Sequence, residues 1–131
     1  MCIFCKIIKG EIPSKKIYED DNVLAILDIS QATKGHTLIM PKKHYDNLLE
    51  IPDEELKNVM VVAKKVAKKI NEVYKPKGIN LLNNCGEAAG QSVMHFHTHI
   101  LPRYEENDIE LKFENHMDKY DLDKIRKEIE L

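Results

Sequence analysis

The chain has 131 residues, enough to bury one hydrophobic core, so we expect a single domain. Its 20 basic and 22 acidic residues give a formal net charge of −2, which excludes a bulk electrostatic attraction to nucleic acid or to an anionic membrane. The charge is uneven. Residues 105–131 carry 10 acids and 5 bases, net −5, which leaves 15 bases against 12 acids, net +3, in residues 1–104.

The composition also bears on location and redox chemistry. No stretch approaches the ~20 apolar residues of a membrane span, and the first residues lack the basic start of a signal peptide, so we expect a cytoplasmic protein. Of the three cysteines, two form Cys2-x-x-Cys5, which favours a metal site or a redox pair over a disulfide framework. The third, Cys85, has no partner, and we expect a buried thiol.

The first part of the chain predicts one short helix and three strands. Apolar residues at helical spacing precede Gly10, a common helix stop, and Pro13 and Ser14 then form a turn. Two β-rich runs separated by three polar residues predict a hairpin, and Pro41 closes a third run. The expected elements are a helix over 2–9 and strands over 16–19, 23–29 and 36–40.

A long helix that begins at Pro52 is the clearest prediction. Acids at 53–55 favour its first turn because they complement the helix dipole. The opposite, basic face is interpreted as solvated charge and comprises Lys64, Lys65, Lys68 and Lys69. The apolar stripe expected to pack on the sheet comprises Leu56, Val59, Met60, Ala63, Val66, Ala67, Ile70 and Val73.

The last part of the chain predicts two strands and a short helix. The strands are expected over 78–83 and over 92–101, where Pro102 stops the second, with a loop of small residues at 85–91. Asp121 is expected to cap a final helix that bears Leu122, Ile125 and Ile129, after a stretch, 105–120, without periodicity. These elements give an α+β fold, an antiparallel sheet of about five strands with one long helix and short N- and C-terminal helices.

Three histidines alternate along the predicted fifth strand, at 95, 97 and 99. Because side chains on a strand alternate between faces, the three imidazoles share one surface at steps of roughly 6.5–7 Å. Two chemistries fit. One is a His-x-His metal chelate completed by a third imidazole. The other is a nucleophile with flanking acid and base groups, because neutral imidazole can attack phosphorus. The small-residue loop 86–92 favours the second, since its backbone N–H groups and the Ser92 hydroxyl suit an oxyanion cradle.

The segment from Gly90 to Leu101 matches the motif His-φ-His-φ-His-φ-φ, and the chain resembles the histidine triad (HIT) family, in particular its HinT-like, zinc-containing prokaryotic branch. Segments in the family's order extend the resemblance over roughly residues 2–104, and Thr98 departs from a hydrophobic motif position. The resemblance implies the HIT-like fold. It places a HIT domain at 1–104, with 105–131 as an acidic C-terminal extension that carries a short helix and belongs to the same single domain.

The resemblance also implies a nucleotide-binding hydrolase or transferase that cleaves a nucleoside α-phosphate bond through a covalent nucleotidyl-histidine intermediate. His97 would be the nucleophile, His99 would contact the phosphate and help to protonate the leaving group, and His95 would orient both. His36 would complete the set of histidines. Around the phosphate or the leaving group the resemblance places Asn84, Ser92, Gln91 and the loop amides, Gly90 included.

For the nucleoside, a purine nucleotide or conjugate, the resemblance implies that Asp28 accepts both ribose hydroxyls. The base would occupy an apolar slot of Ile3, Phe4, Ile7, Ile26 and Ile29, although such spacing is equally typical of plain core. Relatives form a two-fold homodimer through the long helix and the fourth strand. The apolar run 78–83 fits that pairing, and a buried central strand fits it equally well.

A zinc site is the remaining implication. The zinc-containing branch and the galactose-1-phosphate uridylyltransferases bind one metal with two cysteines, a histidine after the third strand and the first triad histidine. This sequence has all four, as Cys2, Cys5, His44 and His95. A reduced thiol pair in the core is the alternative. We therefore expect a structural Zn²⁺ and no cofactor for the chemistry itself.

The branch of the family stays open on sequence. Residues 99–103 resemble the dinucleoside polyphosphate hydrolases, whereas residues 18–44 resemble the phosphoramidases. Two further hypotheses are a nucleotide-binding regulatory module with incidental turnover and a catalytic metal enzyme with three histidine ligands.

Overall fold

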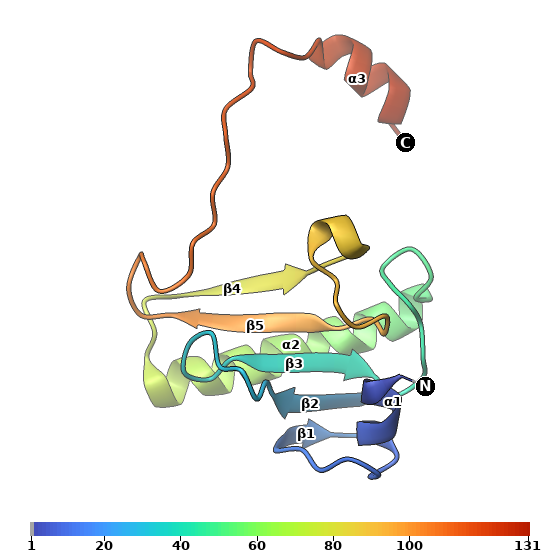
Figure 1. Cartoon of the computed structure of the whole chain (residues 1–131), viewed down its shortest axis with the longest axis vertical. Coiled ribbons are helices and arrows are strands. Elements are labelled where there is room, and N and C mark those ends of the chain that lie inside the picture. Colours follow the sequence, from blue (N-terminus) through green and yellow to red (C-terminus); the bar gives the residue numbers. More distant parts are fainter. Residues whose placement is uncertain (1) are drawn as a thin grey trace.

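The computed structural model describes residues 2–131, which form a five-stranded antiparallel sheet with a helix on each face (Figure 1). The strands lie in the order β1-β2-β3-β5-β4. The helices are α1 (Ile3–Ile8), α2 (Asp53–Tyr74) and α3 (Leu122–Ile129), and the strands are β1 (Lys16–Glu19), β2 (Val23–Leu27), β3 (Thr37–Pro41), β4 (Gly78–Asn83) and β5 (Thr98–Arg103). The predicted α+β class and the β1–β2 hairpin are confirmed.

Both faces of the sheet are buried, and successive residues of β2 pack in the two different hydrophobic cores. Val23 and Ala25 pack under α2, whereas Leu24 and Ile26 pack under α1. The α2-side core also contains Ile39, Val59, Val66, Phe96 and Ile100, and the α1-side core contains Phe4, Ile7, Leu38 and Met40. The small helix α1 thus closes one side of the sheet, where the imidazoles lie.

Helix α2 packs on the sheet with a face slightly different from the predicted stripe. Val62 is buried and was missing from the prediction, whereas Met60 and Val73 are 41% and 55% exposed. Met60 lies about 100° around the helix from the fully buried Val59, at the flank of the contact face. Val73 lies in the last turn, beyond the buried Ile70. The basic face is exposed, as expected.

Strand β5 differs from its prediction at both ends. It begins at Thr98 rather than at residue 92, and it continues through Pro102 to Arg103. Pairing with β3 ends at Ile100, so the later residues have β4 alone as a neighbour. A proline is tolerated there because a strand partnered on one side does not need every N–H for the ladder.

Strand β4 is an edge of the sheet, so the alternative of a buried central strand at 78–83 is wrong. The thiol of Cys85, just beyond it, is partly exposed and not buried as predicted. Residues 105–120 contain no helix or strand, and Asp121 caps α3 as expected, accepting hydrogen bonds from the N–H groups of Asp123 and Lys124. Within residues 2–131, no helix combines the length and apolar character needed to cross a bilayer.

Candidate active site and metal centre

The triad histidines share one face although only His99 lies within β5. The rings of His95 and His97 contact the ring of Phe4 of α1, with centroids 5.9 Å and 4.9 Å apart. Phe96, between them, packs in the α2-side core. The alternation therefore extends three residues before the hydrogen-bonded strand and turns the imidazoles toward α1.

His97 has one ring nitrogen bound and one free. Its Nδ1 lies 2.7 Å from the backbone oxygen of His95, an acceptor, so Nδ1 carries the proton. Nε2 is then left with a lone pair, because a neutral imidazole carries one N–H. Burial lowers the pKa of His97 below its ordinary value, which keeps the ring neutral at pH 7.

His99 is oriented by His36. The N–H of Ala32 donates to Nδ1 of His36 at 3.2 Å, so neutral His36 carries its proton on Nε2 and donates it to Nδ1 of His99 at 2.9 Å. His99 in turn carries its proton on Nε2. Burial, and then the neighbouring His97 and His36, lower the pKa of His99 to about 4.

The segment between β2 and β3 positions both His36 and Asp28. Gln31 fixes it: its side-chain NH₂ donates to the backbone oxygens of Asp28 and His36, at 2.6 Å and 2.7 Å, and its side-chain oxygen accepts from the N–H of Gly35 at 2.9 Å. Oδ2 of Asp28 lies 3.6 Å from Nε2 of His36. Sequence reasoning missed Gln31, because nothing in its pattern distinguishes it from an exposed loop amide.

A cavity of about 280 Å³ opens between α1 and the histidines. The predicted residues that line it are Ile3, Phe4, Ile7, Ile26, Asp28, Ile29, Ser92, His97 and His99. Ile29 is 99% exposed and forms the rim. The prediction missed Ile12, Pro13, Ser14, Leu27, Leu38 and Val93, of which 12–14 could have been found as the turn that directly follows α1. The cavity thus has apolar walls and a polar end that carries a carboxylate, a hydroxyl and two imidazoles.

The loop after β4 brings the remaining predicted residues near one another, outside the cavity lining. Gly90 has φ +94°, a left-handed conformation that favours glycine, and its backbone oxygen accepts from the amide of Asn84 at 3.3 Å. Gln91 is buried and bonds to backbone alone: it accepts from the N–H of Gly86 and donates to the oxygens of Asp46 and Val93. Gln91 therefore shapes the loop.

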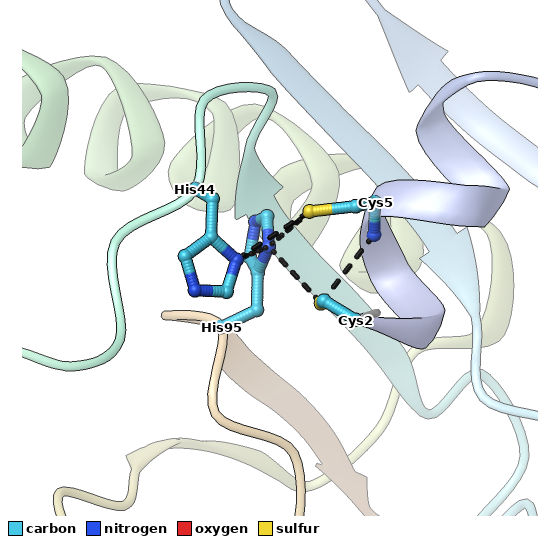
Figure 2. A group of neighbouring side chains, drawn as sticks. All are labelled: Cys2, Cys5, His44 and His95. Atoms are coloured by element: carbon cyan, nitrogen blue, oxygen red, sulfur yellow. Dashed lines mark hydrogen bonds between the residues drawn. The ribbon is translucent and has the colours of Figure 1, made fainter.

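Four side chains from three segments converge beside this cavity (Figure 2). Cys2 and Cys5 of the α1 region face His44, which follows β3, and His95, which precedes β5. Nδ1 of His95 lies 3.5 Å and 3.6 Å from the sulfurs of Cys2 and Cys5, and Nδ1 of His44 lies 3.4 Å from Sγ of Cys5. The two Nδ1 atoms are 3.1 Å apart.

These distances fit a tetrahedral zinc ion. Zinc bonds of roughly 2.0–2.1 Å to nitrogen and 2.3 Å to sulfur put tetrahedral ligands about 3.4 Å apart for two nitrogens and about 3.6 Å apart for nitrogen and sulfur. The outer nitrogens are also fixed, since Nε2 of His95 faces the oxygen of Pro41 at 2.9 Å and Nε2 of His44 faces Oδ1 of Asp46 at 2.8 Å. Such acceptors hold the tautomer that leaves Nδ1 for a metal.

The geometry does not place one metal among the three triad histidines. In the described part of the chain, His95 belongs to the cysteine cluster and His99 to a second group with Asp28 and His36. The Ala32 N–H occupies the lone pair on Nδ1 of His36, so a metal on Nε2 would need a doubly deprotonated ring. The second group is therefore a hydrogen-bonded one, which argues against the three-histidine metal hypothesis.

Comparison with known proteins gives the family. The family model described as the HIT domain matches residues 9–106, three quarters of the chain. The chain belongs to the HIT family.

Similar HIT proteins occur in bacteria, archaea and plants. Protein hit of Bacillus subtilis is 57% identical over 107 residues, which cover 82% of this chain and 74% of that protein. An uncharacterized HIT-like protein of Methanocaldococcus jannaschii is 52% identical and covers 98% of both chains. An Arabidopsis thaliana protein named adenylylsulfatase HINT3 is 48% identical over 79% of this chain, which spans 53% of that protein.

Solved HIT structures share the fold. A HIT family member from Bacillus subtilis has a TM-score of 0.91 at 50% identity and covers 97% of this chain and 93% of its own. A zinc-bound histidine triad family protein from Mycobacterium smegmatis has a TM-score of 0.79 at 38% identity, with coverages of 86% and 82%. A histidine triad nucleotide-binding protein from Candida albicans has a TM-score of 0.82 at 41% identity, with coverages of 97% and 91%.

Proposed function

We propose that this HIT protein hydrolyses a bond to the α-phosphate of a nucleotide, with His97 as nucleophile. The main support for this proposal is the hydrogen bonding of His97. Its Nδ1 donates to the backbone oxygen of His95, and its ring lines the cavity. A buried neutral imidazole in this state keeps a lone pair for attack on phosphorus.

In the first step Nε2 of His97 attacks the α-phosphorus. A nitrogen–phosphorus bond forms while the bond to the leaving group breaks, and the leaving atom takes a proton from Nε2 of His99. The negative charge of the bound substrate phosphate favours the protonated, cationic form of His99, which then donates the proton. The low pKa of His99 without substrate makes it a stronger acid once that proton is present.

In the second step water attacks the nucleotidyl-histidine. The nitrogen–phosphorus bond breaks, its electron pair returns to Nε2 of His97, and the proton of water goes back to the His36–His99 pair. Nucleoside monophosphate is released. We infer that the Ser92 hydroxyl and the loop amides around Gly90 stabilise the phosphate oxygens, as fixed dipoles do in other phosphoryl and acyl transfers.

We propose a purine nucleoside phosphoramidate as the substrate class. The apolar walls between Phe4 and Ile26 suit a planar base, and Asp28 at the polar end suits two ribose hydroxyls. The names of the Candida albicans and Arabidopsis relatives, a nucleotide-binding protein and an adenylylsulfatase, support the nucleotide and the cleavage of an adenylyl bond.

A dinucleoside polyphosphate hydrolase is the alternative that the segment 99–103 raises. Arg103, the last residue of that segment, donates hydrogen bonds to Asp108 and Asn80 and does not line the cavity. We therefore rank phosphoramidates first. Rates on adenosine phosphoramidate, diadenosine polyphosphates and nucleotide sugars, measured in one panel, separate the two, and tight nucleotide binding with weak turnover on all three would favour a regulatory module.

We further propose that Cys2, Cys5, His44 and His95 bind a structural Zn²⁺, for which the zinc-bound Mycobacterium smegmatis relative is support. The bound ion would fix α1 to the sheet and would take no part in the reaction. We also propose a cytoplasmic homodimer that pairs through α2 and β4, one of the two edge strands of the sheet, and a single domain to which 105–131 belongs.

Stereochemistry at phosphorus tests the nucleophile. Two displacements predict overall retention with a chiral α-phosphorothioate substrate in labelled water, and a nucleotidyl-enzyme that can be trapped by rapid quench into alkali, where the nitrogen–phosphorus bond is stable. His97→Ala should lower kcat by several orders of magnitude while nucleotide affinity changes far less. Inverted product, or near-native turnover of the variant, would refute the covalent mechanism.

A further inference from the structure

A second cavity, of about 260 Å³, lies on the α2 side of the sheet and is called the α2-end cavity below. Its walls come from the last turns of α2, from β1 and β2, and from the segment between β2 and β3 (Figure 1). The apolar side chains that line it are Ile17, Leu27, Val66, Ile70, Val73 and Tyr74. A cavity of about 150 Å³ with such walls can hold benzene, so this one has room for a somewhat larger apolar body.

The polar side chains at the α2-end cavity are basic or neutral. Lys34 and Lys69 line it, and none of the described residues that line it is acidic. The ammonium of Lys34 lies 4.4 Å from the centroid of the Tyr74 ring, which is part of the wall. The lysines that form ion pairs within residues 2–131 are Lys16, Lys42, Lys57 and Lys77. Lys34 and Lys69 are not among them, so both ammonium groups are available to an anion.

The segment between β2 and β3 forms one wall and is held in place. Gly35 has φ +96°, and a Cβ there would lie 3.3 Å from Cγ of Pro102 and 3.6 Å from the Tyr74 ring. Glycine thus allows the segment to approach the end of α2 closely. The hydroxyl of Tyr104 donates to the backbone oxygen of Lys34 at 2.7 Å. The wall is therefore formed before any ligand binds, which lowers the entropic cost of binding.

Gln31 connects the α2-end cavity to the reaction site. Its side chain lines this cavity and also makes the three hydrogen bonds that fix the segment carrying Asp28 and His36. Both N–H groups of its amide are already used, so a ligand contacts Gln31 by packing against it and not by taking a donor. A body that fills the cavity therefore keeps Gln31 on the segment.

We propose that the α2-end cavity binds a small monocarboxylate with an apolar body of about six carbon atoms or slightly more. The apolar body packs among Val66, Ile70 and Tyr74, and the carboxylate accepts hydrogen bonds from Lys34 and Lys69. An apolar pocket with a few polar groups at one side is the usual form of a site for such a molecule. Occupancy stabilises the segment between β2 and β3 through Gln31.

Three probes with the same six-carbon chain separate charge from apolar burial: hexanoate, 1-hexanol and hexylammonium. Titration of the full chain, followed by amide chemical shifts, should give a dissociation constant about tenfold lower for hexanoate than for hexanol, because hydrogen bonds from ammonium to carboxylate are strong. Hexylammonium should bind more weakly than hexanol. The shifts should be largest at Gly35 and Val73 and not at Phe4 and Val93, which line the cavity beside the histidines. Equal affinities for the three probes, or no binding, would overturn the proposal.

Substitutions locate the charge that hexanoate meets. Lys34→Gln with Lys69→Gln should abolish the preference for hexanoate over hexanol and leave the hexanol affinity unchanged. The matched control, Lys64→Gln with Lys68→Gln, removes the same charge from α2 residues that do not line the cavity, and it should keep the preference. Val73→Asp adds a carboxylate at an exposed lining position, so the fold should be retained while hexanoate binding is lost. A preference that survives in the Lys34 and Lys69 variant would refute the site.

Hydrogen exchange tests the connection to Gln31. The N–H of Gly35 donates to the side-chain oxygen of Gln31, so it exchanges when that contact opens. A ligand that binds only the closed segment, present at about ten times its dissociation constant, should slow this exchange about tenfold. Amides of α3, a helix without buried residues, serve as the control and should be unaffected. An unchanged rate at Gly35 with hexanoate bound would contradict the stabilisation of the segment. Neither measurement uses turnover, so both outcomes are independent of the reaction proposed for His97.

Discussion

At the scale of single residues, the three triad imidazoles differ in which nitrogen the protein leaves available. His95 presents Nδ1 to the cysteine cluster because Pro41 accepts at its Nε2. His97 has the opposite arrangement, because the oxygen of His95 accepts at its Nδ1. His99 receives a hydrogen bond at Nδ1 from His36. Neighbouring acceptors and donors thus leave a different ring nitrogen available on each of three identical side chains.

The assignment of His99 as proton donor predicts a dependence on the leaving group. His99→Ala should reduce kcat/KM strongly with an alkylamine leaving group and weakly with p-nitrophenolate, which leaves without a proton. His36→Ala should show the same selectivity, since it acts through His99, and the double variant should cost little more than either single one. Equal losses on both substrates would contradict the assignment.

The lowered pKa of His99 predicts a loss of stability in acid. The unfolded chain takes up a proton at this residue near pH 6.5, whereas the folded chain does so only near pH 4. Between these values the unfolded state binds more protons, so the free energy of unfolding falls as pH falls from 6.5 to 4. Urea denaturation at several pH values should show a smaller fall in His99→Asn. The exposed His116 provides the control: His116→Asn should behave as the unmodified chain does.

Thr98 lies between two triad histidines but on the other face of β5, and its burial predicts a stabilising substitution. It is 3% exposed, and among residues 2–131 its hydroxyl has no hydrogen-bond partner. Thr98→Val keeps the shape and removes the unsatisfied group, so the free energy of unfolding should rise by about 1 kcal/mol with unchanged kcat. A loss of stability would mean that the hydroxyl does have a partner, such as a bound water.

At the scale of elements, α1 is a six-residue helix that packs through Phe4 and Ile7. So short a helix has little stability of its own. The proposed zinc would join it to the segments after β3 and before β5, which makes the ion a tertiary cross-link.

Removing both thiolates should therefore weaken the fold more than the chemistry. Cys2→Ser with Cys5→Ser should abolish bound zinc in elemental analysis and lower the melting temperature by several degrees, while activity falls less, since the proposed mechanism gives His95 an orienting role and not the attack on phosphorus. Cys85→Ser, outside the cluster, should retain the metal and the melting temperature. Metal-free native protein, with a double variant that melts unchanged, would rule the zinc proposal out.

At the scale of the whole molecule, the two faces of the sheet differ in what they carry. Helix α2 and one face of the sheet form an apolar core, and the other face, covered by α1, carries the cavity beside the histidines and the cysteine cluster. Along β2 and along residues 95–100, successive side chains alternate between the α2 side and the α1 side of the sheet. Substitutions in the α2-side core, such as that at Thr98, are therefore separable from catalysis.

The elements that could be predicted from the sequence are those that depend on local order: the hairpin of β1 and β2, the long helix after Pro52, the cap at Asp121 and the alternation of the histidines. These follow from periodicity and capping, which act within a few residues. The sequence-based prediction misplaced the ends of β5 because those depend on where β3 stops pairing, a contact between segments about sixty residues apart.

The contacts of each polar group could not be predicted from the sequence and became known from the folded chain. The structure determined that β4 is an edge, that Gln31 fixes the segment carrying Asp28 and His36, and that the Ala32 N–H selects the tautomer of His36. It also brought Cys2 and Cys5 to His44 and His95 at zinc-like spacing, although the family resemblance had named all four. A hydrogen bond or a metal site depends on distances of a few ångströms between residues that can be about ninety positions apart in the chain, and packing sets those distances.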